Sequence, residues 1–543
     1  MGDRVCNLAD LFEVVVDTVP DRLALVAGDA RLTYRRLDER ANRVAHHLLD
    51  QGIEPGDKVA IYAWNRAEWI EAMLGAYKAR AVPVNVNYRY VADEARHILE
   101  NSDSVAVVAE RAFAPVISEI RDDLPRLRHV IVLEDGSSEP ADADAVGYED
   151  ALAAAAPTRD FSPRSPDDLY LLYTGGTTGM PKGVMWRAED IFFAALGGGG
   201  FGQPPIEDAQ ELAGRVAAED ARSVQLVNAP MMHGGGQWVT FITLYGGGTV
   251  VLNCQHHFDP GEVWRIVARE RCTGIMVVGD AMGRPLAEAL AAPGAAYDTS
   301  SVVVVGSGGA ILSPAVKEQL RAQLPNAMVM DSFGASETGA GGTVYDTQGP
   351  AAGPRFTMGE FMTVLDDDGN ALRPGSGEVG HLARRGHIPL GYYKDDAKTA
   401  ATFTTSADGT RWVVPGDFAT IEADGTITML GRGSVCINTG GEKVYPEEVE
   451  AALKSHPDVF DAVVVGAPDD RFVERIAAIV QPRPGTAPTL AELQDHCRTK
   501  LAGYKMPRQL VVTDEPVRTP VGKPDYRRAK RLATNEPSTQ GAP

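Results

Sequence analysis

Residues 171–183 read Leu-Leu-Tyr-Thr-Gly-Gly-Thr-Thr-Gly-Met-Pro-Lys-Gly and form the most informative stretch of the chain. An apolar strand runs here into a loop of glycine and threonine that ends at a lysine. Successive backbone N–H groups of such a loop can surround an anion, while hydroxyls and the lysine add donors and charge. The stretch therefore predicts a phosphate-binding loop. It differs from the P-loop of nucleotide triphosphatases, because Pro181 precedes Lys182 and Gly183 replaces the Ser or Thr that would bind magnesium.

Short β-branched runs alternate with amphipathic helical patterns on both sides of this loop. Residues 59–63 predict a strand, and the apolar positions 70, 73, 74 and 77 then have the spacing of a half-buried helix. Strands that are apolar at every position need cover on both faces. The sequence therefore predicts an α/β fold, with a large N-terminal domain of parallel, helix-wrapped sheets. Further apolar runs occur at residues 82–86, 105–108, 130–133, 249–252, 275–278 and 302–305.

The character of the chain changes near residues 431–434. Pro446 opens an acidic stretch that predicts a helix N-terminus, and strands at residues 462–465 and 476–480 and a helix at about 490–502 follow. We predict a small, mobile α+β C-terminal domain of ordinary domain size. The last residues are small and polar, which is typical of a disordered tail. The predicted parts are residues 1–432, 433–532 and 533–543.

Composition and charge exclude several classes of partner. The chain has 52 Lys and Arg against 74 Asp and Glu, a net charge of −22, which repels nucleic acid and anionic lipid at long range. No apolar run approaches the ~20 residues of a membrane span, and the N-terminus lacks the apolar core of a signal peptide. The five cysteines are scattered, which argues against a disulfide framework or a structural zinc site. We therefore expect a cytoplasmic protein without a transmembrane segment.

Five further motifs follow the loop along the chain, and together they resemble the adenylate-forming (ANL) superfamily, in particular its acyl-CoA synthetases. The resemblance covers about residues 10–532 and keeps the order of the family motifs. Ser336 and Pro415 both stand where the family usually has threonine. The motifs are Phe-Gly-Ala-Ser-Glu at 333–337, Gly-Tyr-Tyr at 391–393, Trp-Val-Val-Pro-Gly-Asp at 412–417, Gly-Arg at 431–432 with Gly-Gly-Glu-Lys-Val-Tyr-Pro at 440–446, and Arg-Thr-Pro-Val-Gly-Lys at 518–523.

The resemblance implies that the protein uses ATP, Mg²⁺ and coenzyme A. ATP and a carboxylate are both anions, so catalysis depends mostly on charge neutralisation and positioning. Ser336 would contact the α-phosphate, Glu337 and Thr174 would hold Mg²⁺, and Lys523 would bridge the carboxylate and the α-phosphate. The remaining ATP contacts would be, for the phosphates, Thr174, Gly175, Gly176, Thr177, Thr178 and Lys182; for adenine, Gly308, Gly309, Ala310, Asp331, Ser332 and Phe333; and for ribose, Asp417 and Arg432.

The second half-reaction, thioester formation with coenzyme A, needs another surface. In the family the small domain rotates about a hinge and brings a glycine loop to the pantetheine channel. Here the hinge position would be Ser434, where relatives often have Asp or Lys, and the channel loop would contain Gly440, Gly441 and Lys443.

Residues 229–236 occupy the substrate-gate segment of the family. The predicted acyl pocket contains His233, Gly234, Gly235, Gly306 and Gly334, although a histidine that only caps a strand end remains the alternative for His233. Gly334 leaves room where acetate-specific relatives carry tryptophan, and no Asp in the gate would pair with an amino group. We therefore predict a medium-chain, long-chain or bulky carboxylic acid. Residues 184–187 and 522–527 are similar to actinobacterial ligases for fatty acids and sterol side chains.

Three alternatives share the scaffold. A fatty acyl-AMP ligase would stop at the adenylate, a luciferase-type monooxygenase would emit light, and a non-catalytic nucleotide-binding relative would usually lack Glu337, Asp417 or Lys523, which are all present. The expected partners are a small-molecule carboxylic acid, ATP and coenzyme A. Whether the chain forms a homodimer is left open.

Overall fold

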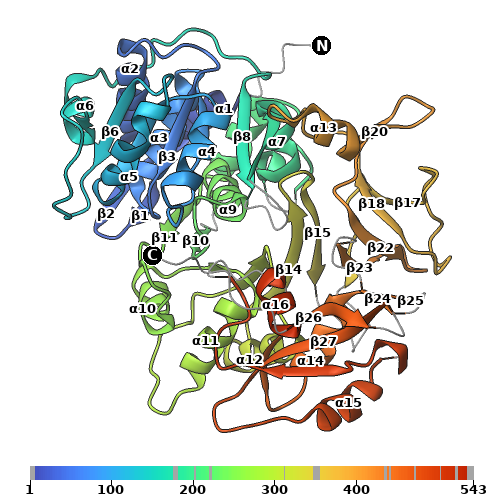
Figure 1. Cartoon of the computed structure of the whole chain (residues 1–543). Helices are drawn as coiled ribbons and strands as arrows, with labels where there is room; N and C mark the ends of the chain where they lie inside the picture. Colours follow the sequence, from blue (N-terminus) through green and yellow to red (C-terminus); the bar gives the residue numbers. More distant parts are fainter. Residues whose placement is uncertain are drawn as a thin grey trace.

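The computed structural model describes residues 7–174, 181–200, 203–218, 223–310, 312–345, 355–432, 437–439, 442–469, 473–501, 503–519 and 524–534. Within these residues the fold is mixed α/β, with three sheets in a large N-terminal part and a fourth sheet in a smaller C-terminal part (Figure 1). This confirms the predicted fold class. The proposed domain boundaries stay a prediction.

The first sheet has eight strands, and its central strands run parallel. Apolar residues such as Leu226, Ile275 and Val305 face α10, α11 and α12 on one side, while α9 covers the other side. In sheet order the strands are β15 (Gly339–Tyr345), β14 (Met328–Ala335), β13 (Val304–Gly308), β12 (Gly274–Val277), β10 (Val224–Val227), β11 (Thr249–Leu252), β1 (Leu23–Ala27) and β2 (Ala30–Thr33). The helices are α8 (Ala209–Ala218), α9 (Gly234–Tyr245), α10 (Pro260–Glu270), α11 (Gly279–Ala291) and α12 (Pro314–Gln323).

The second sheet also has eight strands, and it carries the two flanks of the predicted phosphate loop. A continuous apolar core reaches from this sheet to the first one through α1, α2, α3 and α9, and α4 and α5 cover its other face. In sheet order the strands are β19 (Gly391–Tyr392), β9 (Lys182–Arg187), β8 (Leu169–Thr174), β4 (Val82–Asn85), β3 (Lys58–Tyr62), β5 (Ser104–Glu110), β6 (His129–Leu133) and β7 (Val146–Gly147). The helices are α1 (Leu8–Thr18), α2 (Tyr34–Asp50), α3 (Ala67–Lys78), α4 (Ala92–Asn101), α5 (Ala114–Ile120), α6 (Tyr148–Ala154) and α7 (Ala188–Ala195).

The predicted strands and the α3 helix of these two sheets are confirmed, with one shift. The apolar run 302–305 was expected to be a strand, but β13 begins at Val304 and extends into the following glycines. Val303 is 57% exposed, so the start of the run does not enter the sheet. The glycines extend the strand because parallel neighbours bond to them on both sides, as Gly306 pairs with Met276 and Met330.

The third sheet is antiparallel and was not predicted. Its strands are short and are joined by tight turns, such as those at Gly369, Gly409 and Gly425, where a positive φ favours glycine. Short strands of this kind carry a weak periodic signal. The strands are β16 (Arg355–Phe356), β17 (Met362–Leu365), β18 (Gly380–Arg384), β20 (Phe403–Thr405), β21 (Arg411–Val413), β22 (Asp417–Ile421) and β23 (Ile427–Arg432), with α13 (Asp396–Thr402) beside them.

The C-terminal part is an α+β unit, as predicted. Its last predicted helix ends at Arg498, earlier than expected, because the amides of Thr499 and Lys500 bond to carbonyls three residues back and tighten the last turn. Figure 1 shows this part, in orange and red, lying against α11, where Arg284 stacks on Phe460. The elements are β24 (Ile437–Thr439), β25 (Glu442–Val444), α14 (Pro446–Lys454), β26 (Val459–Asp469), β27 (Val473–Pro482), α15 (Leu490–Arg498), β28 (Gln509–Val512) and α16 (Tyr526–Thr534).

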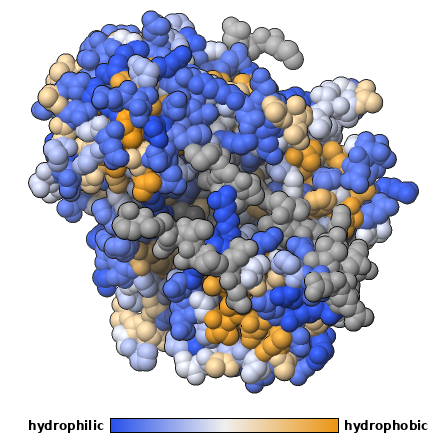
Figure 2. All heavy atoms as spheres, in the orientation of Figure 1, coloured by the Kyte–Doolittle hydropathy of each residue, from blue (hydrophilic) through white to orange (hydrophobic). Residues whose placement is uncertain are grey.

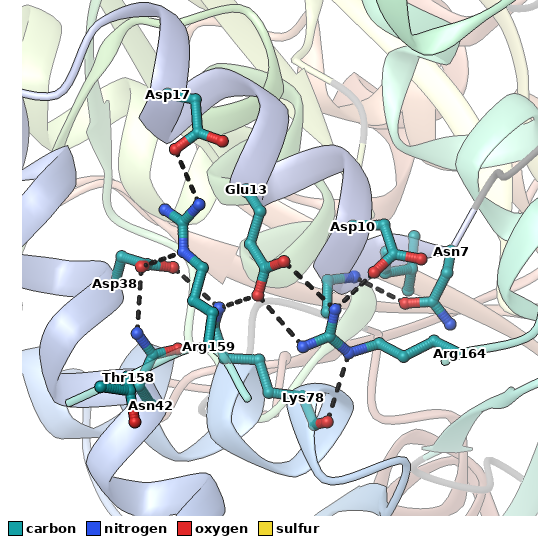
Figure 3. A network of polar contacts seen from close by, with 12 residues as sticks. Asn7, Asp10, Glu13, Asp17, Asp38, Asn42, Lys78, Thr158, Arg159 and Arg164 are labelled. Carbon is teal, nitrogen blue, oxygen red and sulfur yellow. Dashed lines mark hydrogen bonds and ion pairs between the residues drawn. The ribbon is translucent and has the colours of Figure 1, made fainter. Parts of the chain in front are cut away.

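A buried ion-pair network joins α1, α2 and α3 to the segment that leads into β8 (Figure 3). The Lys78 side chain at the end of α3 is fully buried and pairs with Glu13 on α1 and with Asp38 on α2, the latter over 2.8 Å. Arg159 and Arg164 bind the same two carboxylates from the segment before β8, over 2.7 Å and 3.1 Å. Each buried charge is thus paired, and the network fixes the approach to the phosphate loop.

The side chains on the visible surface are mostly hydrophilic (Figure 2). Figure 2 shows a face that is largely covered by hydrophilic side chains, with a hydrophobic area over the C-terminal part. In the described part of the chain, no helix is both long enough and apolar enough to cross a membrane.

Candidate active site

A buried amide joins the strand before the phosphate loop to the predicted gate. The Asn85 side chain at the end of β4 donates hydrogen bonds to the carbonyls of Tyr173 (2.9 Å) and Met232 (2.7 Å) and accepts one from the Tyr173 amide (2.8 Å). Thr174 and His233 follow these two residues directly. The predicted phosphate and gate residues therefore meet at the carboxyl edge of the second sheet, where ligands of parallel sheets usually bind.

The two flanks of the phosphate loop lie opposite each other, because Thr174 and Lys182 are register partners in the β8–β9 pair. The Lys182 ammonium lies 2.5 Å from a carboxylate oxygen of Asp395, the residue that caps α13. This hydrogen bond holds the pKa of Asp395 below its usual value. Phosphate oxygens would therefore have to compete with Asp395 for this lysine.

The turn that carries Ser336 and Glu337 is anchored to the same sheet at two points. Trp186 on β9 donates from Nε1 to the Ser336 carbonyl (2.9 Å), and the Tyr392 hydroxyl donates to Glu337 Oε1 (2.8 Å). Tyr392 lies on β19, which pairs with β9. Motifs that are far apart in the sequence thus converge beside the phosphate loop.

A buried arginine supports this turn from the third sheet. Arg384 on β18 donates from one guanidinium nitrogen to the carbonyls of Thr338 (2.7 Å) and Ala340 (2.6 Å). Burial lowers the pKa of Arg384 to about 10. The arginine therefore fixes the backbone that follows Glu337, at the cost of burying a charge.

The residues present fit a magnesium ion that is held mainly by nucleotide. Within the described residues, no three His, Cys, Asp or Glu side chains gather as a metal-binding group. Mg²⁺ in nucleotide enzymes is often bound by one or two carboxylates together with phosphate oxygens and water. Glu337 is half-buried, and Tyr392 orients its carboxylate, which suits this mode.

The predicted adenine residues surround the ends of β13 and β14. Gly308 ends β13, and Gly309 follows with a φ of +78°. The Ala310 carbonyl accepts a hydrogen bond from the Ser307 hydroxyl (2.7 Å), which closes the turn. Phe333 packs edge-on against Phe356, with ring centroids 4.7 Å apart. This backbone and ring form one continuous rim at the carboxyl edge of the first sheet.

Asp331 faces away from that rim. Its carboxylate accepts a hydrogen bond from the Leu312 amide (3.0 Å) and pairs with Lys317 on α12 (2.7 Å). Burial raises the pKa of this carboxyl. Its neighbour Ser332 points to the opposite side of the strand and lines a cavity. In this structure Asp331 therefore joins β14 to α12, and its contact with adenine stays a prediction.

The predicted ribose residue lies at the junction of the two parts of the chain. Asp417 begins β22 and is the register partner of Arg432 at the end of β23. Glu447 on α14 lies nearby, and burial and the negative charges of Glu450 and Asp417 raise the pKa of Glu447 to about 8. A Cβ atom at Gly431 would lie 2.1 Å from the Glu447 carboxylate, so only glycine permits this contact.

Several predicted residues lie outside the described part of the chain, and their roles stay predictions. For Arg432 and Lys443, the structure describes the backbone alone. The residues outside are Gly175, Gly176, Thr177, Thr178, Ser434, Gly440, Gly441 and Lys523.

A cavity of about 580 Å³ lies between the first sheet and α9. Its size is within the ~300–1,000 Å³ range of small-molecule sites. Predicted residues Gly306, Gly308 and Ser332 line it on the sheet side, and Val239 and Ile242 line it on the helix side. Two of the predicted adenine residues, Gly308 and Ser332, line this cavity, so it is the candidate acyl pocket.

The other predicted pocket residues are not part of this lining. A Cβ at Gly234 would lie 2.9 Å from Leu172, and one at Gly334 would lie 2.5 Å from the Gly339 carbonyl oxygen. These glycines therefore permit close packing rather than add room. His233 precedes α9 as its N-cap residue, and its contact with substrate stays a prediction.

Sequence reasoning missed several residues of the site, such as Asp395, Arg384 and Glu447, and three more are Asn85, Tyr392 and Met276. Asn85 carries no motif, and Tyr392 was quoted within Gly-Tyr-Tyr without a role. Met276 lies between two predicted residues, since its methyl would be 3.3 Å from a Cβ at either Gly235 or Gly308. It therefore separates the cavity from the gate segment.

Comparison with known proteins identifies relatives over the whole chain. The profile of the AMP-binding enzymes matches residues 12–393, and that of the AMP-binding enzyme C-terminal domain matches residues 448–523. A medium/long-chain-fatty-acid–CoA/3-oxocholest-4-en-26-oate–CoA ligase of Mycolicibacterium smegmatis is 51% identical, with 98% of both chains covered. A 3-oxocholest-4-en-26-oate–CoA ligase of Rhodococcus rhodochrous is 49% identical, with 96% of this chain and 95% of the relative covered.

Solved structures share the fold. The crystal structure of the anthranilate CoA ligase AuaEII in complex with anthranoyl-AMP matches with a TM-score of 0.82 at 24% identity, with 97% of both chains covered. ATP-bound MatB from Rhodopseudomonas palustris matches with a TM-score of 0.79 at 25% identity, with 97% of this chain and 98% of MatB covered.

Proposed function

Because this chain belongs to the family of AMP-binding enzymes, we propose that it is an AMP-forming ligase that joins a medium-chain, long-chain or bulky carboxylic acid to coenzyme A. The resemblance inferred from the motifs is thereby confirmed at the level of the family. Full-length relatives at about half identity are named as ligases for fatty acids and for 3-oxocholest-4-en-26-oate. By its name, the latter acid carries a keto group and a carboxylate at opposite ends.

The proposed reaction has two steps. A carboxylate oxygen of the acid attacks the α-phosphorus of ATP, the bond to the β-phosphate oxygen breaks, and pyrophosphate leaves. The thiol of coenzyme A then loses its proton and attacks the acyl carbon, and AMP leaves with the bonding electron pair. Mg²⁺ at Glu337 would neutralise phosphate charge in the first step, and Lys182 and Lys523 would add positive charge.

The proposal rests mainly on one observation, the anchoring of Ser336 and Glu337 beside the phosphate-loop flanks by Trp186 and Tyr392. Like charges can react only where cations and donors surround both reactants, and these contacts bring Ser336 and Glu337 to the strands that flank the phosphate loop. A short acid would leave most of a cavity of about 580 Å³ unfilled, which supports a large acid.

The test is pyrophosphate release by the purified chain, with ATP and Mg²⁺, across acids of rising size and with or without coenzyme A. We expect rates to rise from acetate to long or polycyclic acids, and a thioester to form when coenzyme A is present. A preference for acetate would contradict the large-acid proposal. Adenylate that accumulates without thioester would instead favour an acyl-AMP ligase.

Lys523→Ala separates the two steps. We expect it to abolish adenylation and to spare thioester formation from a supplied acyl-adenylate. Equal loss of both steps would contradict the role proposed for Lys523.

A further inference from the structure

The acyl cavity has a direction along the strands of the first sheet. Gly308 and Ser332, which are themselves predicted adenine residues, line it at the carboxyl edge, and Val304 lines it at the start of β13. At ~3.3 Å per residue, the stretch from Val304 to Gly308 spans about 13 Å. An acid whose carboxylate reacts at the carboxyl edge therefore extends its far end toward the start of β10, β12 and β13.

The half-buried side chain of Gln225 lines the cavity at that far end. Its Nε2 makes a long bond of 3.3 Å to the adjacent Leu226 carbonyl, and no hydrogen bond to its Oε1 is found among the residues that the structure describes. The nearby Arg215 is engaged by Glu211 and by the Pro204 carbonyl (2.7 Å). Gln225 therefore keeps hydrogen-bonding capacity toward the cavity.

Glycine at position 274 makes this arrangement possible. Gln225 and Gly274 are register partners in the β10–β12 pair. A Cβ atom at Gly274 would lie 2.0 Å from Gln225 Oε1 and 2.9 Å from its Cδ. Any other residue at position 274 would displace the amide, so the two positions act together.

We propose that Gln225 is a specificity-determining residue that hydrogen-bonds a keto or hydroxyl oxygen at the end of the acid remote from its carboxylate. This inference rests on the proposed acyl-CoA ligase function. A wholly hydrocarbon ligand removes water from the amide and leaves it without a partner, whereas a ligand oxygen restores the hydrogen bond. The site therefore prefers a long acid with a distal oxygen over an acid of the same shape that lacks it.

The test compares two polycyclic side-chain acids that differ only in a distal ketone. The readout is kcat/KM for pyrophosphate release by the full chain. We expect the wild type to prefer the keto acid by about three- to tenfold, the effect of one neutral hydrogen bond. Gln225→Leu should abolish that preference, because the keto acid loses its hydrogen bond while its deoxy partner loses none.

Val304→Ala is the matched control, because Val304 lines the same end of the cavity without a polar group. It should lower kcat/KM for both acids alike. Gly274→Ala should abolish the keto preference as Gln225→Leu does, and Gln225→Met replaces Gln225→Leu if the latter does not fold.

An active enzyme whose keto preference survives both Gln225→Leu and Gly274→Ala would overturn the inference and leave the proposed function standing. The same holds if Gln225→Leu lowers kcat/KM equally for the keto acid and its deoxy partner. A wild type that releases no pyrophosphate with any acid would overturn the proposed function itself, and this inference with it.

Discussion

Replacing Tyr392 with phenylalanine tests whether the contact between this tyrosine and Glu337 serves catalysis. The hydroxyl donates to Glu337 Oε1 over 2.8 Å, while the ring packs against Phe403 with centroids 6.2 Å apart. Tyr392→Phe removes the donor and keeps the ring. The carboxylate would then be free to rotate away from the position proposed for Mg²⁺.

The size of the expected loss in kcat follows from the type of hydrogen bond that Tyr392→Phe removes. A hydrogen bond to a charged group contributes about 1.5–3 kcal/mol, and the half-exposed carboxylate can recover part of this from water. We therefore expect a loss near the lower limit, about tenfold in kcat for pyrophosphate release. The Mg²⁺ concentration needed for half-maximal rate should rise, and KM for the acid should stay unchanged.

Tyr393→Phe is the matched control. Its hydroxyl donates to Asp103 over 2.8 Å and does not contact Glu337, so the variant should keep the wild-type Mg²⁺ dependence. Thermal unfolding of both variants excludes a general loss of fold. The reasoning is refuted if the two variants have the same kinetics, or if Tyr392→Phe changes only KM for the acid.

Three further predictions concern stability, pH and substrate length. Lys78→Met should lower the free energy of unfolding by about 3–5 kcal/mol, because it leaves the buried carboxylate of Asp38 and the half-buried carboxylate of Glu13 short of a partner. The exposed Arg36–Glu39 pair is the control, since Arg36→Met should cost under ~1 kcal/mol in urea titrations. Equal effects of the two variants would contradict the network. The pKa of Glu447 is raised to about 8, so between pH ~4.3, the usual pKa of a glutamate, and pH 8 the folded state keeps a proton that the unfolded state has lost. The free energy of unfolding should therefore fall as pH rises through this range and then level off, and Glu447→Gln should remove this fall in urea midpoints measured across the range. Parallel pH profiles of wild type and variant would disprove the shift. Gly306→Leu should lower kcat/KM for long acids at least about tenfold and spare short ones. The backbone accepts the substitution, because a Cβ there meets its nearest atom, Met330 Cγ, at 3.9 Å, and the leucine side chain then enters the cavity. An unchanged dependence of kcat/KM on chain length would show that acids bind elsewhere.

Local patterns predicted the parallel sheets well, because strands covered on both faces are apolar at every position. The runs at residues 59–63 and 249–252 correspond to β3 and β11, and the stripe between residues 70 and 77 lies on α3. The third sheet escaped prediction because several of its strands have only two or three residues and its turns take few residues. Hydrophobic periodicity needs several residues of one element before it can be recognised.

The residue types of the motifs predicted the chemistry of the site, because a glycine loop with hydroxyls and a lysine suits phosphate wherever the fold places it. The residue types did not predict the direction in which each side chain points. Asp331 and Ser332 are adjacent in sequence, yet Asp331 pairs with Lys317 on α12 and Ser332 lines the cavity, since successive side chains of a strand point to opposite faces. Contacts across long sequence separations, such as Tyr392 with Glu337 and Gln225 with Gly274, depend on strand register and packing. Motif residues therefore predicted the family, while the partners that orient them, and the shape of the acyl cavity, arise only when distant segments pack together.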